Sequence, residues 1–250
     1  MIIVKNATEL QKVKRACELA AKALKLTGER ICAGMSTREL DRIIREFIVK
    51  NGGKPSSLGY RGFKGSACIS VNEELIHGIP SKKKILKDGD IVSVDIAANL
   101  DGWHGDNAYT FKVGKVSEKA ERLLQITEEC LYEGIKAALP GNRIGDISNA
   151  VQTYCENKGF YIVKKYIGHG IGRDFHEDPD VPNFGKAGKG PRLVPGMTIC
   201  IEPMINSTTE EVKLLSDNWT VVEANGNLSA HFEHTIAITE GLPVILTKLN

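Results

Sequence analysis

The two halves of the sequence carry the same arrangement of glycines, apolar runs and acidic residues. In each half, one acid lies six residues after a glycine, at the end of an alternating apolar run, and a second acid lies eight residues before another glycine. These positions are Gly89 and Asp95, then Asp106 and Gly114, in the first half, and Gly196 and Glu202, then Glu233 and Gly241, in the second. The repetition predicts a duplicated unit folded about a pseudo-twofold axis, with one acidic pair from each copy.

Two of these acids lie in apolar surroundings. Asp95 stands between Val94 and Ile96, and Glu202 follows the run Thr198–Ile201. Burying an unpaired carboxylate is costly, so each needs a basic side chain, a helix N-terminus or a metal ion as a partner. The runs themselves contain no Lys or Arg, which favours a metal.

The dipeptide Asp101-Gly102 predicts a tight hairpin turn. With a two-residue turn, Ala97 lies opposite Asp106, and Asp95 lies opposite Ala108. Strand side chains alternate between faces, so Asp95 and Asp106 share a face as diagonal neighbours, roughly 5–8 Å apart at Cβ. A bulge near Trp103 would shift this register by one residue.

Helices and hairpins alternate along the chain, which predicts an α+β fold rather than a parallel doubly wound sheet. Capping patterns and breakers predict helices that begin at Thr8 (a capping box with Gln11), at Ser36 (ending at Gly52-Gly53), at Ser117 (ending at Pro140-Gly141) and at Gly145 (ending at Gly159). Strands are predicted over Ala67–Ser70, Asp90–Ala98, His104–Val113, Met197–Ile205, Glu211–Ala224 and Leu228–Thr239. Asn225-Gly226 predicts a second hairpin, and Asn183–Pro195 a surface loop.

Length and composition narrow the class of protein. A chain of 250 residues is near the upper size of one domain. A formal charge of +2 argues against a general nucleic-acid binder, including a DNA-binding protein. The run Lys82-Lys83-Lys84 is typical of a solvated loop, with a contact to ribosomal RNA as the alternative.

Cysteine spacing and hydropathy bear on location. The six cysteines form no CxxC pair, which indicates free thiols in a reducing compartment. No apolar run approaches the ~18 residues of a membrane span, and the N-terminus has no signal-type stretch. We therefore expect a cytoplasmic protein without a membrane contact.

Three of the six histidines are candidates for function. His169 stands between two glycines that allow a close approach of the backbone, His77 is followed by Gly-Ile-Pro, and His176 lies seven residues after His169. For His104, His231 and His234 we expect ordinary satisfied side chains, the commoner role of an isolated histidine.

An ordered set of motifs carries a family resemblance over essentially the whole chain. The motifs are His77-Gly-Ile-Pro, Val94-Asp95, His104-Gly-Asp106, Gly168-His169-Gly-Ile-Gly172, Phe175-His176-Glu177, Ile201-Glu202-Pro203-Met204 and Phe232-Glu233-His234-Thr235. The set resembles the type I methionine aminopeptidases. That resemblance implies the pita-bread α+β fold, with two pseudo-twofold-related halves of antiparallel strands covered by helices. It also implies one catalytic domain over residues 1–250 that removes N-terminal methionine and prefers a small second residue.

The resemblance implies a site with two divalent metal ions. Asp95 and Asp106 would bind one ion, Asp106 and Glu233 would bridge to the second, and His169 and Glu202 would complete it. A metal-bound hydroxide would attack the first peptide carbonyl with Glu202 as proton shuttle, while the substrate amine would lie at the metal held by Asp95. Oxygen-rich ligands favour Mn²⁺, Co²⁺ or Fe²⁺, with Zn²⁺ as a further option.

Further residues are assigned by the same resemblance. His77 would contact the scissile nitrogen, and His176 the carbonyl oxygen or the gem-diolate. An apolar methionine pocket would comprise Tyr60, Phe63, Cys68, Phe175 and Trp219, with Ser57 on its rim. Phe63 is often tyrosine and Ser57 often cysteine in the family, so this pocket has fewer polar groups. Asn72 and Ser229 match positions that hold a monovalent cation in some members.

Two other readings stay open on sequence alone. A Xaa-Pro aminopeptidase or dipeptidase shares the fold but usually carries an extra N-terminal domain, and a creatinase-type hydrolase lacks the metal ligands. A non-catalytic pita-bread binding protein typically loses those ligands too. Glu202 and Glu233 are 31 positions apart, which leaves no room for the helical insertion of type II relatives. We expect a monomer that acts on nascent polypeptide N-termini, with a transient ribosome contact.

Overall fold

The computed structural model describes residues 1–249, and nine strands of that part form one antiparallel sheet. The strands of this sheet are β1 (Lys54–Pro55), β2 (Cys68–Val71), β4 (Ile91–Leu100), β5 (Trp103–Lys112), β7 (Gly168–Gly170), β8 (Glu177–Val181), β9 (Thr198–Ile201), β14 (Glu233–Ala237) and β15 (Val244–Ile245). They run in the order β1-β4-β5-β14-β9-β7-β8, with β2 on β4 and β15 on β14. The expected α+β class with antiparallel strands is confirmed.

Two small sheets lie beside the large one. One consists of β13 (Ser229–His231), β10 (Met204–Asn206) and β6 (Tyr161–Ile162). The other consists of β11 (Val212–Leu214), β12 (Val221–Glu223) and β3 (Glu74–Ile76). A 3₁₀ turn, η1 (Tyr60–Gly62), lies between β1 and β2.

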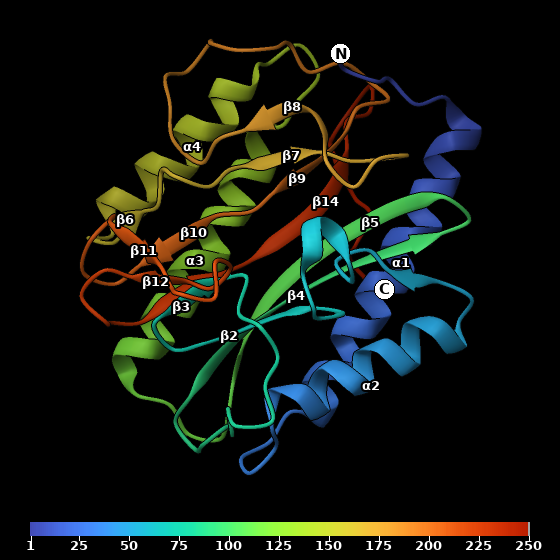
Figure 1. Cartoon of the computed structure of the whole chain (residues 1–250). Helices are drawn as coiled ribbons and strands as arrows, with labels where there is room; N and C mark the ends of the chain where they lie inside the picture. Colours follow the sequence, from blue (N-terminus) through green and yellow to red (C-terminus); the bar gives the residue numbers. More distant parts are fainter. Residues whose placement is uncertain (250) are drawn as a thin grey trace.

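Four helices pack against the sheet in two pairs. They are α1 (Ala7–Arg30), α2 (Thr37–Lys50), α3 (Glu118–Ala137) and α4 (Ile144–Asn157). In Figure 1, α1 and α2 flank the β4–β5 hairpin, whereas α3 and α4 lie by the strands of the second half. At Gly105 of β5 the strand lies very near α1, since an added Cβ would be 2.3 Å from the backbone nitrogen of Cys17. Only glycine allows this helix to lie so near the strand. None of the helices in residues 1–249 is long and apolar enough to cross a membrane.

The central four strands reproduce the internal repeat. Their order is β4-β5-β14-β9. The strands that carry the second acid of each half, β5 with Asp106 and β14 with Glu233, therefore lie side by side. The first acidic strand of each half, β4 and β9, lies outside that pair. The two halves therefore meet along β5 and β14, as a pseudo-twofold arrangement requires.

Helix starts agree with the sequence patterns for α2 and α3 and differ for α1, and α4 begins at Ile144, one residue before the predicted Gly145. Ser36 caps α2 by accepting from the Glu39 amide, and Ser117 caps α3 in the same way from Ala120. The predicted box at Thr8 is wrong. Asn6 caps α1 instead, because its Oδ1 accepts from the Glu9 amide while the Glu9 carboxylate accepts from the Asn6 amide.

Three predicted strands are each divided in the structure. The run 197–205 breaks at Glu202-Pro203 into β9 and β10, and the run 228–239 breaks at Phe232 into β13 and β14. At both breaks the chain leaves one sheet for another, and Pro203 has no N–H to continue a ladder. The run 211–224 likewise divides into β11 and β12, which pair with each other.

The predicted hairpin at Asn225-Gly226 is wrong. A turn does form, because the Gly226 amide donates to the Glu223 carbonyl at 3.1 Å and Gly226 has φ +73°. However, β12 pairs with β11 and β3, while β13 pairs with β10. The turn therefore connects two sheets rather than two paired strands. The loop predicted at Asn183–Pro195 is confirmed.

Candidate active site

The hairpin at Asp101-Gly102 has the predicted two-residue turn and register. Ala97 pairs with Asp106, and Asp95 pairs with Ala108. On the other edge of β5, Ala108 also pairs with Glu233 of β14. Directly paired residues share a face, so Asp95, Asp106 and Glu233 point to the same side across three adjacent strands.

The second half adds an imidazole and a carboxylate. Glu202 follows directly on β9, and His169 lies in β7, which pairs with β9. His169 Nε2 lies 3.9 Å from Asp106 Oδ2 and 3.7 Å from Glu202 Oε1. The five residues singled out as ligands therefore face one cavity of about 380 Å³.

His169 is oriented as a ligand would be. Its Nδ1 lies 2.8 Å from the Gly170 carbonyl, which can only accept, so Nδ1 carries the proton and Nε2 has a lone pair. Burial lowers the pKa of His169 to about 4, so the ring is neutral at pH 7. A neutral imidazole with a backbone-held Nδ1–H is the usual form of a metal-binding histidine.

The four carboxyl groups are buried close together, and the pKa of each is raised. Burial is the largest cause in every case. Repulsion from neighbouring acids adds to it at Asp106, Glu202 and Glu233. No lysine or arginine in residues 1–249 forms an ion pair with any of the four. A cation is what such a group of acids requires for compensation.

Two oxygens show that these residues fit a divalent metal. Asp106 Oδ1 and Glu233 Oε1 are buried and have no hydrogen-bond partner in the described part of the chain. One ligand atom from each of Asp106, His169, Glu233 and Cys200 lies within 4.8 Å of the others. Cys200 was not expected here. Burial raises the pKa of its thiol, which also contacts Thr235, so it stays protonated and is a poor ligand.

The residues expected to contact the substrate line the same cavity. Aromatic contacts connect its wall, with ring centroids 5.1 Å apart for Tyr60 and Phe175 and 5.1 Å apart for Phe63 and Trp219. The other expected residues on the lining are Ser57, Cys68, His77 and His176. Sequence reasoning missed Tyr166, whose ring lies 5.9 Å from that of His77. We find no sequence signal that would have identified it.

The two candidate histidines outside the ligand set are both neutral at pH 7. Burial lowers the pKa of His77 to about 4. Burial is the largest cause that lowers the pKa of His176 to about 3, and the nearby basic side chains His169 and Arg61 lower it further. His176 stacks on Tyr60 and lies 4.2 Å from His169 between ring centroids. Each ring can therefore exchange hydrogen bonds with a substrate without adding charge.

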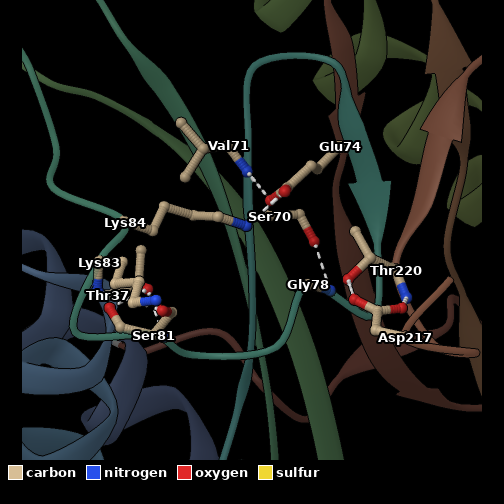
Figure 2. Close-up of polar contacts among 10 residues, drawn as sticks. All are labelled: Thr37, Ser70, Val71, Glu74, Gly78, Ser81, Lys83, Lys84, Asp217 and Thr220. Carbon is tan, nitrogen blue, oxygen red and sulfur yellow. Dashed lines mark hydrogen bonds and ion pairs between the residues drawn. The ribbon is translucent and has the colours of Figure 1, made fainter. Parts of the chain in front are cut away.

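His77 lies in a tight turn directly before Gly78, and Figure 2 shows the polar contacts around Gly78. The φ of +58° at His77 is unusual for a residue other than glycine. The following amide, Gly78, donates to Ser70 Oγ at 3.0 Å. Behind the turn, Lys84 forms an ion pair with Glu74, whose other oxygen accepts from the Val71 amide at 2.9 Å. Glu74 thus connects the β2–β3 turn to the loop after His77.

Breaking that ion pair should destabilise the protein. Lys84→Met leaves the buried Glu74 carboxylate without its cation, and we expect the free energy of unfolding to fall by about 1–3 kcal/mol in urea titrations. Lys83→Met is the matched control, since Lys83 is exposed and forms no ion pair within residues 1–249. Equal losses for both variants would contradict the assigned role of the pair.

The two residues expected at a monovalent cation lie outside the cavity. Asn72 Nδ2 donates to Asp90, Asn72 Oδ1 accepts from the Ile91 amide, and Ser229 Oγ donates to Asn206. The Ser229 amide donates to the Asn72 carbonyl at 2.9 Å, so the two residues are adjacent. Their side chains are already satisfied, which leaves only backbone oxygens for an ion.

The three histidines expected to be ordinary differ from one another. His104 contacts Ser56 and Asn99 at 2.8 Å each, and His234 contacts Thr247 at 2.8 Å, so both have partners. His231 has none within the described residues, and its Nε2 lies 3.6 Å from Glu202 Oε2. Period-two alternation from Glu233 is the sequence signal that could have placed it near the site.

Comparison with known proteins gives consistent results. The profile of metallopeptidase family M24 matches residues 11–240. A methionine aminopeptidase 1 of Bacillus subtilis is 52% identical, and a methionine aminopeptidase of Clostridium perfringens 51%, each over the full length of both chains. The crystal structure of a Thermotoga maritima methionine aminopeptidase superposes with a TM-score of 0.98 at 43% identity, covering all of both chains. A Pyrococcus furiosus prolidase superposes at 0.81 with 25% identity, and 66% of that longer chain is covered.

Proposed function

Because the chain belongs to metallopeptidase family M24, we propose that its buried acidic cavity removes the N-terminal methionine from polypeptides by hydrolysing the first peptide bond. The single observation that carries this proposal is the convergence of four buried carboxyl groups and His169, without a basic partner, on a cavity with aromatic walls. The pita-bread fold is shared with the methionine aminopeptidases and prolidases of known structure.

The acidic group is a site for divalent metal. We propose that Asp95, Asp106, His169, Glu202 and Glu233 would hold two divalent ions between them. When bound, the metals supply a water nucleophile at neutral pH and a Lewis acid for the peptide carbonyl. Carboxylate and imidazole ligands favour Mn²⁺, Co²⁺ or Fe²⁺, and Zn²⁺ is compatible with the same set.

The residues around the metals have complementary tasks in this proposal. Glu202 accepts a proton from the attacking water and passes it to the departing amine. His77 contacts the scissile nitrogen, and His176 the carbonyl oxygen. The aromatic rings Tyr60, Phe63, Phe175 and Trp219, with Cys68, enclose the methionine side chain, and Ser57 lies at the edge of that pocket.

The rival readings are less well supported. The prolidase match covers two thirds of that protein at 25% identity, whereas methionine aminopeptidases match at 43–52% over whole chains. A non-catalytic binding protein would have no need for a complete set of buried acids without basic partners. The intact set therefore favours the peptidase.

Peptides that differ only in the second residue test the proposal. The metal-loaded protein should release methionine from Met-Ala-Ser and Met-Gly-Ser, and Met-Lys-Ser should react at least about tenfold more slowly, because a large second side chain meets a crowded cleft. The released amino acid is identified by mass spectrometry, with Leu-Ala-Ser as control. Release of the second residue, or equal rates for Ala and Lys, would contradict the assignment.

The cellular setting follows from the same proposal. We propose that residues 1–250 act as one catalytic domain on nascent N-termini, although Asn250 itself lies outside the described residues. All six cysteines are free thiols, which supports a cytoplasmic location. We further propose a monomer that contacts the ribosome transiently.

A further inference from the structure

His231 is the last residue of β13 and is 2% exposed. Its backbone is held on both sides by one hydroxyl, because its amide donates to Thr110 Oγ1 at 3.0 Å and its carbonyl accepts from that oxygen at 2.8 Å. Thr110 in turn contacts Ser93 Oγ at 2.8 Å. The sheet thus determines where the ring lies.

The imidazole itself has no hydrogen-bond partner. Neither ring nitrogen is satisfied within residues 1–249, although the side chain is fully enclosed. Leaving a buried donor unpaired is costly, so such a group is expected to have a partner in the working state. The nearest acid is Glu202, whose Oε2 is 3.6 Å from Nε2.

The Glu202 carboxylate therefore lies between two imidazoles. Its Oε1 faces His169 at 3.7 Å, and its Oε2 faces His231 at 3.6 Å. The two rings differ in access, because His169 lines the cavity and His231 does not. Because His231 does not line the cavity and its nearest acid is Glu202, its effect on a reaction in the cavity passes through Glu202.

We propose that His231 is a positioning residue, whose ring Nε2–H donates to Glu202 Oε2 and sets the orientation of that carboxylate. A shift of about 0.7 Å brings the pair to an ordinary hydrogen-bond length of about 2.9 Å. With one oxygen held by His231, the other faces the metal side of the cavity. The inference rests on the proposed function, in which Glu202 moves the proton.

Substitution separates positioning from packing. His231→Leu introduces an apolar side chain of similar bulk and removes the hydrogen-bond donor. We expect kcat on Met-Ala-Ser to fall about 10–100-fold, with KM within about twofold of wild type. His231→Gln restores an N–H donor at similar reach, and we expect it to recover activity to within about threefold of wild type. His234→Gln is the control. His234 lies on the opposite face of β14 from Glu233 and contacts Thr247, so the kcat of His234→Gln should equal that of the wild type.

Three results would overturn the inference. They are wild-type kcat in His231→Leu, failure of His231→Gln to recover while its melting temperature is normal, and a Nε2–Oε2 distance longer than 3.2 Å in a crystal structure of the Mn²⁺-loaded wild type. The last measurement decides the matter even if His231→Leu does not fold. Wild-type protein that releases no methionine would overturn the proposed function instead, so the two failures are distinguishable.

Discussion

Asp106→Asn should lower kcat/KM on Met-Ala-Ser at least about a thousandfold, which corresponds to about 4 kcal/mol of transition-state stabilisation. Asp106 is 4% exposed, and its Oδ1 has no partner within the described chain. An amide has nearly the same shape, but it lacks the charge and one of the two acceptor oxygens that a bridging ligand needs. The measurement is steady-state hydrolysis with Mn²⁺ in excess.

The fold should survive this change. Burial and neighbouring acids raise the pKa of Asp106, so a neutral amide relieves repulsion and the melting temperature of the metal-free protein should not fall. Asp101→Asn is the matched control on the same hairpin, since Asp101 is exposed at the turn and forms only a surface ion pair with Arg15. Activity near wild type in Asp106→Asn would contradict the proposed metal centre.

Removing divalent metal should abolish hydrolysis and also destabilise the protein. At a metal concentration of about 100 times the Kd, binding adds about 2.7 kcal/mol, which for a chain of this size is a rise of roughly 5–10 °C in melting temperature. Dialysis against a chelator followed by addition of Mn²⁺ or Co²⁺, with calorimetry and peptide assays in parallel, measures both effects. Full activity after exhaustive chelation would contradict the metal requirement.

The pH dependence of the metal-free protein provides a second readout. The four buried acids have raised pKa values, so the native state binds more protons than the unfolded chain and their contribution to stability is lost as pH rises. The buried histidines have the opposite effect, because their pKa values fall from 6.5 to about 4 or 3 and stability rises until about pH 6.5. Above pH 6.5 the histidines no longer offset the acids.

Metal-free protein should therefore lose stability between pH 6.5 and 8, and the rise in melting temperature on adding Mn²⁺ should be larger at pH 8 than at pH 6. Asp106→Asn, with one acid fewer, should show a weaker loss over the same range. A metal-free stability that rises steadily to pH 8 would show that the acids do not repel one another in the folded state.

Local patterns predicted the acidic hairpin correctly. Asp101-Gly102 allows one two-residue turn, and strand periodicity then determines which side Asp95 and Asp106 face. The duplicated spacing also predicted that the two acidic pairs belong to related halves. These features depend on neighbours in the chain, so sequence alone was sufficient for them.

Features that depend on contacts between distant parts of the chain were harder to predict from the sequence. The breaks at Pro203 and Phe232 arise because the strands change partners between sheets, which no local pattern records. Asn6 rather than Thr8 caps α1, because two adjacent capping patterns compete and Glu9 completes the capping box with Asn6. The acid that faces His231 is Glu202, which follows β9 and lies 29 positions earlier in the chain.

The pairing of β5 with β14 determines how the acidic centre depends on protein concentration. Each half contributes only two of the four acids, and the complete set exists only where these strands meet. Two separate halves would assemble such a centre only by associating, at a fraction set by their concentration. Because both halves belong to one polypeptide, the encounter is intramolecular and the centre forms at any dilution.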